Sequence, residues 1–557
     1  SASGGAVDLS KIPVGSLQQI SVHTGAPPLE LSTRSPTGTI ELTSLAGKDF
    51  IAANAELGGY GTLKGSMLMR RTWGKLTNQI SADMGSAENN YPFEYRPFIN
   101  SDEQTMLLKK KNNQFWFTSA FYSADYSINE DNSLFALVRY DGNDKGIYVQ
   151  NVHPDSSQRA RTQQDGFSAI VRYDRNVSDR LTLRLEGTGG YKVGTFTDPD
   201  RRIAFVGSNQ VTTQPMGEVS VRTVLSAFPG LTVRMLTGVI FEQYSQKDRE
   251  SSSPMVDLQP TSRRLGGYLG AEFEAAFGLL KTRAKYMHRY DYDESEGFAN
   301  GLIPIASHAA GKHFPLADVE IAISPLEPLS LYGSGHVHRR NPDFFEKFGS
   351  SGSTVGSPDL LPEQMVGGEA GMRLSTKFLK SSLAGTISQT FNKIKPVPLS
   401  YGRFKMMNSS QVRRVGAEWS LELTPFDWLL LSNSLTLTRS TLHETPDPAI
   451  EGNFEPLTPW VQERLSVQAS VKKFTFGHRL LAMSPYFAGE YNTRLESNAP
   501  ILDIYAGYDF SRFLSLTYRL ENYLNVYNED FPDFVRPGRM HFLSLNVTFS
   551  NGWGEMR

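Results

Sequence analysis

Short turns divide this chain at intervals of a few dozen residues, and the segments beside them alternate apolar and polar residues. In residues 181–186 three leucines alternate with Thr182, Arg184 and Glu186, and residues 414–423 and 543–549 follow the same rule. Successive residues of a β-strand point to opposite faces, so each segment predicts a strand with one apolar and one polar face. The ten predicted turns are residues 73–75, 111–113, 176–179, 228–230, 277–279, 325–328, 377–380, 425–428, 472–474 and 510–513.

The connections between these strands alternate in length. Longer polar stretches rich in Gly, Pro, Asn and Asp separate the ten short turns. An outer-membrane β-barrel has short turns at its periplasmic end and long loops at its extracellular end. Ten short turns separate eleven hairpins, so we predict an all-β fold, a 22-stranded antiparallel transmembrane β-barrel. A soluble β-sandwich has the same period, but the arginines that recur on the polar faces favour a water-filled barrel.

Composition excludes several classes of protein. The chain has 557 residues, with no linker or change of composition after about residue 50 that would separate domains. Its 56 basic and 58 acidic residues nearly cancel, which gives no electrostatic support for a nucleic-acid partner. With no cysteine, the chain forms no disulfide and no thiolate metal site. It contains no zinc-protease, nucleophile-elbow or P-loop motif, so we expect no enzyme, no cofactor and no metal.

Four segments carry a resemblance to a known family. Residues 521–549 contain an Asn-aromatic turn, then Pro-Gly-Arg, then a strand that ends on an aromatic residue. Residues 341–371 contain a Leu-x-Pro-Glu step into a strand, and residues 407–425 contain an Asn followed by Gly-x-Glu. Residues 12–44 end in a Gly-x-Ile-x-Leu-Thr strand. In this order, the segments resemble those of TonB-dependent outer-membrane receptors. The matching residues are Leu360, Pro362, Glu363, Glu369, Gly416, Glu418, Pro537, Gly538, Arg539 and Phe549.

The resemblance implies a domain organisation and a function. Residues 1–50 would be the C-terminal part of the plug domain, inside a barrel of residues 51–549, with a tail at 550–557. The chain would be an integral protein of the bacterial outer membrane that imports a scarce, bulky nutrient, such as a ferric siderophore, cobalamin or an oligosaccharide. Its implied partners are TonB, outer-membrane lipid and lipopolysaccharide, and the nutrient itself.

The plug of the family is longer and opens with a TonB box, and neither feature precedes residue 12 here. We expect that an N-terminal segment, which would contact TonB, was lost or trimmed. The alternative is a receptor-like barrel that does not transport and instead acts as a scaffold for a partner, such as a surface lipoprotein.

Ligand contacts are predicted on one strand and one loop. Alternation from Leu329 onward points Tyr332, Ser334, His336, His338 and Arg340 into the lumen. The two histidines either hold a transition metal or are polar lumen residues that contact the plug, and His308 and His313 are expected in a neighbouring loop. Aromatic loop residues suit a bulky ligand. The candidate ligand-binding residues are Tyr95, Arg96, Tyr332, His336, His338 and Arg340.

Two further groups of polar residues leave alternatives open. Asp141, Asn143 and Asp144 are read as a calcium-binding turn or, more simply, as an ordinary Asx/Gly turn. A set of inward basic residues either pairs with carboxylates and the plug or attracts an anionic ligand. These inward residues are Arg172, Arg184, Arg234, Lys285, Arg414, Arg464 and Arg519.

Overall fold

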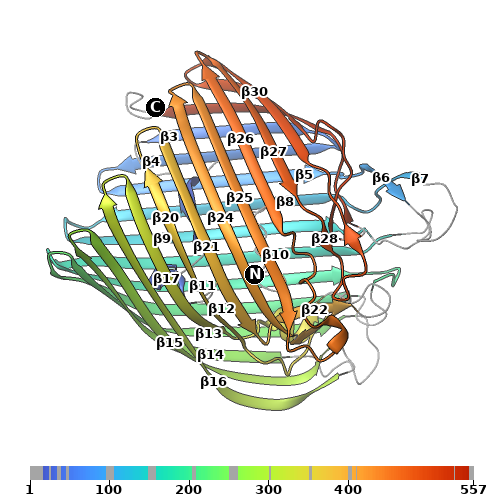
Figure 1. Cartoon of the computed structure of the whole chain (residues 1–557), viewed down its shortest axis with the longest axis horizontal. Helices are drawn as coiled ribbons and strands as arrows, with labels where there is room; N and C mark the ends of the chain where they lie inside the picture. The colour runs from blue at the N-terminus through green and yellow to red at the C-terminus, as the bar shows by residue number, and fades with distance from the viewer. Residues whose placement is uncertain are drawn as a thin grey trace.

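The computed structural model shows a single closed β-barrel (Figure 1). The structure describes residues 17–23, 27–33, 39–44, 49–95, 106–148, 158–203, 209–249, 261–299, 303–350, 354–398, 404–408, 410–531 and 534–550. The predicted 22-stranded antiparallel barrel is confirmed. Its strands are β3 (Phe50–Gly58), β4 (Thr62–Trp73), β5 (Leu76–Ala87), β8 (Phe115–Ser127), β9 (Asn132–Gly146), β10 (Arg161–Ser178), β11 (Leu181–Thr197), β12 (Asn209–Phe228), β13 (Leu231–Asp248), β14 (Thr261–Phe277), β15 (Leu280–Ala299), β16 (Ile303–Leu326), β17 (Leu329–Arg340), β20 (Glu363–Ser375), β21 (Leu379–Phe391), β24 (Gln411–Phe426), β25 (Leu429–His443), β26 (Val461–Val471), β27 (Phe474–Met483), β30 (Ile501–Ser511), β31 (Leu514–Glu521) and β34 (Met540–Ser550).

The first and last barrel strands pair with each other and close the sheet. β3 runs antiparallel to β34, from the pair Phe50 and Ser550 to the pair Gly58 and Phe542. Each of the other strands pairs with the barrel strands next to it in sequence. Closure leaves no unpaired edge, which a sheet in hydrocarbon requires because lipid offers its backbone no hydrogen bonds.

The short turns gather at one end of the barrel, and one of them was predicted in the wrong place. Residues 111–113 lie in the long connection between β5 and β8, and the second short turn is formed by residues 128–131. Asn112 does make a tight bend, with φ of 51°. Its side-chain amide donates to the carbonyls of Ile147 and Ala160, so this bend belongs to the extracellular loops. A turn signal in sequence does not say at which end of the barrel the turn lies.

Smaller elements lie in the N-terminal segment and in the long connections. The N-terminal segment contains a hairpin and one turn of 3₁₀ helix, and the connections hold one short helix, a second 3₁₀ turn and short strands. These elements are β1 (Leu17–His23), η3 (Leu29–Leu31), β2 (Thr39–Ser44), β6 (Pro92–Tyr95), β7 (Met106–Lys109), α1 (Phe344–Phe348), β18 (Gly349–Ser350), β19 (Thr354–Val355), β22 (Ile394–Pro398), β23 (Phe404–Asn408), η5 (Pro448–Ile450), β28 (Tyr486–Phe487), β29 (Leu495–Glu496), β32 (Glu529–Phe531) and β33 (Phe534–Val535).

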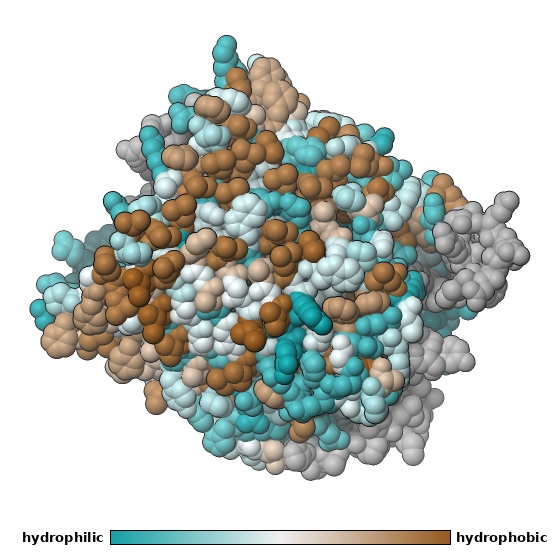
Figure 2. Space-filling view, in the orientation of Figure 1, coloured by the Kyte–Doolittle hydropathy of each residue, from teal (hydrophilic) through white to brown (hydrophobic). Residues whose placement is uncertain are grey.

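The outer face of the barrel is apolar. On β14, Leu265, Leu269 and Phe273 point outward and are exposed, whereas Gly266, Tyr268, Gly270 and Glu272 point into the lumen and are buried. Figure 2 shows apolar residues spread along the strand wall, with polar residues gathered toward the end that carries the long connections. None of the helices in the described ranges is long and apolar enough to cross a membrane.

A charge on the outer face should destabilise the barrel. Leu269→Arg places a guanidinium in the middle of β14, where the native side chain is 64 % exposed to the lipid side. Burying this charge in hydrocarbon should cost about 2–4 kcal/mol of unfolding free energy. Urea unfolding in liposomes measures the loss. The matched control is Thr188→Arg on the lumen face of β11, opposite Glu218. An equal loss in the two variants would contradict the assigned orientation.

Candidate functional site

The lumen is the candidate site, and the N-terminal segment occupies one of its walls. Leu29 is fully buried in a cluster with Leu236, Ile240, Tyr268, Met287 and Leu316, which lie on β13 to β16. An added Cβ at Gly270 would lie 2.8 Å from Leu29 Cδ1, so this glycine makes room for the leucine.

Polar contacts fix the same segment to the wall. Glu272 on β14 accepts a hydrogen bond from the Leu29 amide at 3.2 Å, and Arg222 on β12 binds the Glu30 carboxylate at 2.8 Å. Lys285 on β15 donates to the Pro27 carbonyl and, at 2.7 Å, to Ser32 Oγ. The segment is therefore held by both apolar packing and charged hydrogen bonds across β12 to β16.

Asp318 on β16 joins this docked segment to the predicted histidines. One carboxylate oxygen lies 2.8 Å from Lys285 Nζ, and the other lies 2.7 Å from His338 Nε2. His338 is 1 % exposed and Lys285 is 4 % exposed, so the bridge is buried. Asp318 was not among the residues predicted from the sequence. Its only sequence signal is its place on the polar face of β16.

The His336 and His338 rings both lie on the lumen face of β17, as predicted, and they stack with centroids 4.9 Å apart. His338 Nδ1 and His336 Nε2 are buried with no hydrogen-bond partner. In the parts of the chain that the structure describes, no group of three or more His, Asp or Glu residues is arranged to hold a metal. The observed polar contact of this pair is the hydrogen bond between His338 and Asp318.

Two sequence predictions about neighbouring polar residues were wrong. His308 and His313 lie in β16, not in a loop. His313 Nδ1 faces His288 Nε2 at 3.0 Å, and the His308 side chain falls outside the described residues. Asp141 to Asp144 lie within β9 and form no turn, because these residues pair in register with β8 and β10. Asp144 binds Arg161 at 2.7 Å across the strands.

The loop after β17 folds back into the extracellular part of the lumen. Its sequence, Asp343 followed by Phe-Phe-Glu, forms a capping box: Asp343 accepts from the Glu346 amide and Glu346 accepts from the Asp343 amide, each at 2.8 Å. Gly349, with φ of 74°, ends the helix α1. Phe348 of α1 is fully buried and stacks on Tyr244 of β13 at 5.2 Å.

Buried ion pairs hold α1 in place. Asp293 on β15 binds Arg264 at 2.7 Å and Lys347 at 2.5 Å. Burial lowers the pKa of Lys347 to about 8, although Asp293 favours its charged form. Arg340, a predicted ligand contact, binds both oxygens of Glu346 at 2.8 Å and also Glu363. Removing a single partner would leave a buried charge unpaired, which costs about 3–5 kcal/mol.

The family-motif residues have mainly structural contacts. Leu360 packs in a buried cluster with Ile394 and Met406, and Glu363 accepts from the Ile394 amide at 2.7 Å. The neighbouring Pro362 is also buried, and Glu369 lies on β20 opposite Ser334 and Thr386. Gly416 and Glu418 lie on β24, where an added Cβ at Gly416 would lie 2.7 Å from the Leu437 carbonyl oxygen.

The same holds for the motif at the end of the chain. Pro537 accepts from the Asn522 side chain at 3.3 Å, and Arg539 donates its amide to Asn525 Oδ1 at 2.8 Å. Gly538 is buried, and it leaves no room for a side chain, since an added Cβ would lie 2.4 Å from Asn525 Oδ1. Phe549 is exposed on the outer face of β34, with its ring 5.0 Å from that of Phe513.

The remaining predicted contacts are Tyr332, Tyr95 and Arg96. Tyr332 is buried on β17, beneath the guanidinium of Arg373, which lies 3.8 Å from its ring centroid. Tyr95 ends β6 at the extracellular end, although its side chain, like the whole of Arg96, lies outside the described residues.

Most inward basic residues are paired, which sequence alone could not establish. The pairs are Arg172 with Glu186, Arg184 with Asp174, Arg234 with Glu272 and Glu274, Lys285 with Asp318, Arg414 with Glu455, and Arg519 with Glu56 and Glu521. Arg464 has no carboxylate within 4 Å in the described part of the chain, and neither has Arg479 on the next strand. These two residues face a hollow on the wall formed by β25, β26, β27 and β30, which we call the wall of β25 to β30. It is a different wall from that of β12 to β16, on which residues 27–33 are docked.

The extracellular connections are tied together at Glu455, which the sequence analysis also missed. Its carboxylate contacts Lys393 of the β21–β24 connection and binds Arg414 of β24 at 2.8 Å. Ser440 of β25 donates to it at 2.5 Å. Burial by itself would raise the pKa of Glu455, but Lys393 and Arg414 outweigh it and hold the pKa at about 2.

The architecture defines the class of protein first: a closed outer-membrane barrel with a polar lumen that a segment of the chain occupies. A family model described as TonB dependent receptor-like, β-barrel matches residues 72–528, and the chain belongs to this family. The predicted family and the outer-membrane location are thereby confirmed. The members of this family are receptors and transporters.

Solved structures agree with this assignment at the level of the fold. The chain is similar to the copper transporter OprC, with a TM-score of 0.78 and 12 % identity, over 97 % of this chain and 87 % of that one. It is also similar to the siderophore receptor PiuA from Acinetobacter baumannii, with a TM-score of 0.75 and 12 % identity, over 96 % and 86 %. A third similar structure is the FrpB iron transporter from Neisseria meningitidis, F5-1 variant. Its TM-score is 0.75 and its identity 11 %, over 96 % of this chain and 89 % of that one. A search of curated proteins found no match.

Enlarging Gly270 should release the docked segment. Gly270→Val would push Leu29 off the wall, and overpacking of this kind costs about 1–3 kcal/mol. We expect a reporter thiol at Thr33→Cys to react roughly tenfold faster with a water-soluble maleimide. The native chain has no cysteine to interfere.

The control for this experiment is Gly507→Val on the lumen face of β30, where an added Cβ would lie 3.5 Å from its nearest neighbour. This variant should leave the labelling rate unchanged. Equal rates for Gly270→Val and the parent protein would show that Leu29 does not anchor the segment.

The stability of the extracellular connections should depend on pH through Glu455. The folded-state pKa of Glu455, about 2, lies below the ordinary value of 4.5. The stabilisation that the ionised Glu455 carboxylate gives to the folded connections is therefore fully present above pH 4.5. It is lost as the pH falls from 4.5 toward 2, and should amount to roughly 3 kcal/mol. Glu455→Gln should remove this pH dependence, as measured by hydrogen exchange in residues 444–460. Asp427→Asn, in a turn at the opposite end, should keep it.

Proposed function

We propose that this protein is a TonB-dependent uptake receptor that captures a scarce, bulky nutrient with its extracellular connections and passes it through the lumen. The observation that carries the proposal is the segment of residues 27–33 docked inside a 22-stranded barrel. A passive porin needs an open lumen. Residues 27–33 resemble part of a plug, because packing and ion pairs hold them on the lumen wall, and in this family TonB supplies the energy that rearranges the plug.

The domain organisation is part of the proposal. Residues 1–50 act as the C-terminal part of a plug, residues 51–549 as the barrel, and residues 550–557 as a tail. The contacts of Leu29 and Lys285 support the first assignment, because they place part of this region inside the barrel. The proposed membrane contacts are outer-membrane lipid and lipopolysaccharide on the outer face.

The proposed ligand contacts lie at the extracellular end. In the sequence Tyr95 and Arg96 belong to the β5–β8 connection, and Tyr95 ends β6. Tyr332 and His336 line the wall below, where the ligand would pass. His338 and Arg340 are held by Asp318 and Glu346, so we propose that they position the neighbouring residues of the wall.

An iron or other metal chelate is the first ligand class to test. Among solved structures of similar fold are proteins described as a copper transporter, a siderophore receptor and an iron transporter. Cobalamin and oligosaccharides are the other ligand classes to test.

Uptake should depend on TonB. The full native gene, expressed in an outer-membrane receptor-deficient host, should give saturable uptake of one radiolabelled ligand from a panel of ferric siderophores, cobalamin and maltodextrins. In a strain lacking TonB, this uptake should fall to the level of the empty vector. Tyr95→Ala combined with Arg96→Ala should raise the half-saturation concentration without lowering the amount of receptor in the membrane.

Uptake that is equal with and without TonB would overturn the proposal. So would an absence of uptake for every ligand together with co-purification of a surface lipoprotein, because this result would favour the scaffold function.

A further inference from the structure

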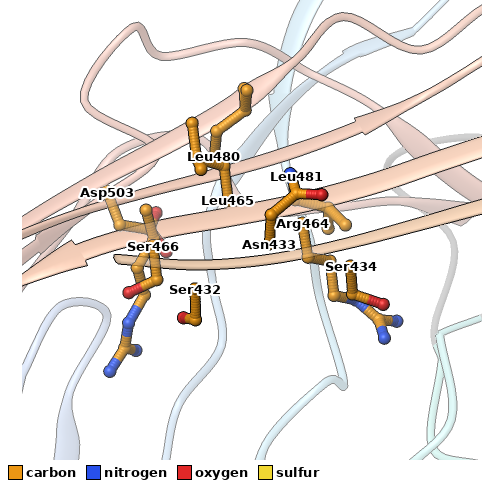
Figure 3. Close-up of a pocket in the computed structure, with 10 residues that line it drawn as sticks. Ser432, Asn433, Ser434, Arg464, Leu465, Ser466, Leu480, Leu481 and Asp503 are labelled. Atoms are coloured by element: carbon orange, nitrogen blue, oxygen red, sulfur yellow. The ribbon is translucent and has the colours of Figure 1, made fainter. Parts of the chain in front are cut away.

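The wall formed by β25 to β30 carries a hollow of about 390 Å³ that faces the lumen. Ser432 and Ser434 on β25, Arg464 and Ser466 on β26, and Arg479 on β27 line it together with Asp503 on β30. Figure 3 shows Arg464 and Ser434 on one side of the sheet, and Leu465 and Leu480 extending from the other side. The polar side is the lumen face, because the outward residues of these strands, such as Phe476, are exposed and apolar.

The register brings the two arginines together with hydroxyl groups. Ser434 is opposite Arg464, and Ser466 is opposite Arg479, so one serine flanks each guanidinium. Arg479 is also opposite Asp503. It forms no ion pair with Asp503, and its guanidinium instead stacks on the Tyr505 ring at 5.0 Å. The Asp503 carboxylate accepts from the Asn522 amide at 2.8 Å.

These two arginines lack the carboxylate partners that several other inward arginines have. Inward arginines elsewhere, including Arg172, Arg234 and Arg414, have a carboxylate within 4 Å. Arg464 and Arg479 are exposed to the lumen and have none in the part of the chain that the structure describes. Two like charges on adjacent strands repel each other, and an anion bound beside them would lower that repulsion.

We infer that this hollow is a lumenal binding site for an anionic group, a carboxylate or a phosphate, of the ligand in transit. Guanidinium groups bind such groups through paired, charge-assisted hydrogen bonds, and the serine hydroxyls supply further donors. The inference rests on the proposed uptake function. It adds that the ligand carries negative charge and that it passes along β25 to β30, while residues 27–33 dock on the facing side of the lumen, across β12 to β16.

The charge at the hollow is measured with a single thiol. Ser434→Cys is introduced into the full native chain, and its rates of reaction with an anionic sulfonatoethyl and a cationic trimethylammonioethyl thiosulfonate are compared at low ionic strength. For each variant, the rate with the anionic reagent is divided by the rate with the cationic reagent, and this ratio is then divided by the same ratio for a free thiol in solution. The resulting ratio for Ser434→Cys should exceed that for Ser220→Cys by roughly tenfold. Ser220 is a lumen-facing control on β12 opposite Glu186, whose charge is neutralised by Arg172.

Variants of the two arginines identify the source of this charge. Arg464→Gln combined with Arg479→Gln should bring the ratio down to the control value, whereas the double lysine variant should keep it. Millimolar citrate or inorganic phosphate should slow the labelling of Ser434→Cys in the parent protein and not in the glutamine variant. Protection by citrate but not by phosphate would assign the site to carboxylates, and the reverse would assign it to phosphates.

Three outcomes would overturn the inference: an unchanged ratio in the glutamine variant, no protection by either anion, or an unreactive Ser434→Cys in a correctly folded barrel. The last result would mean that protein covers the wall. TonB-dependent uptake that persists under any of them would leave the proposed function standing and remove only this site. Protection by an anion without TonB-dependent uptake would keep the anion site and overturn the proposed uptake function.

Discussion

The closure of the sheet is the constraint on which the rest of this structure depends. In hydrocarbon every backbone N–H and C=O must find its partner within the protein, and the pairing of β3 with β34 completes that set. Once the sheet is closed, one face of every strand meets lipid and the other meets an enclosed aqueous lumen. The same closure that makes the outer face apolar therefore collects the polar residues of all the strands into one compartment.

Within that compartment, ion pairs hold residues 27–33 and the loop after β17 against the barrel wall. Asp318 holds Lys285 and His338, and thereby connects the docked segment of residues 27–33 with β17. Asp293 holds Lys347 and so anchors the loop after β17 inside the lumen. Buried ion pairs such as these stabilise little in total, because desolvation offsets the attraction, but each is costly to break singly. They favour one arrangement of the segment and the loop over others.

Charged contacts also link extracellular connections at the open end of the barrel. Glu455 joins residues from two connections and two strands, so these loops are a connected surface and not independent appendages. A receptor that binds a ligand across several loops gains from this arrangement, because less conformational entropy is lost when the loops are already ordered.

The sequence by itself determined the fold class, the number of strands and the direction in which most side chains point, because the period of two is a local property of each strand. His336 and His338 were assigned to the lumen for this reason. The tertiary structure alone decided which partners they meet. Asp318 is 20 residues from His338 in the chain, and Leu29 packs on strands that follow it by more than two hundred residues. The misplaced turn at residues 111–113 and the assumed loop around His313 have the same origin, since a local turn signal carries no information about the end of the barrel or the pairing of strands. Likewise, every inward arginine looks alike in sequence. Only the register of neighbouring strands, which is set by closure of the whole sheet, separates Arg172, which pairs with Glu186, from Arg464 and Arg479, which have no carboxylate within 4 Å among the described residues.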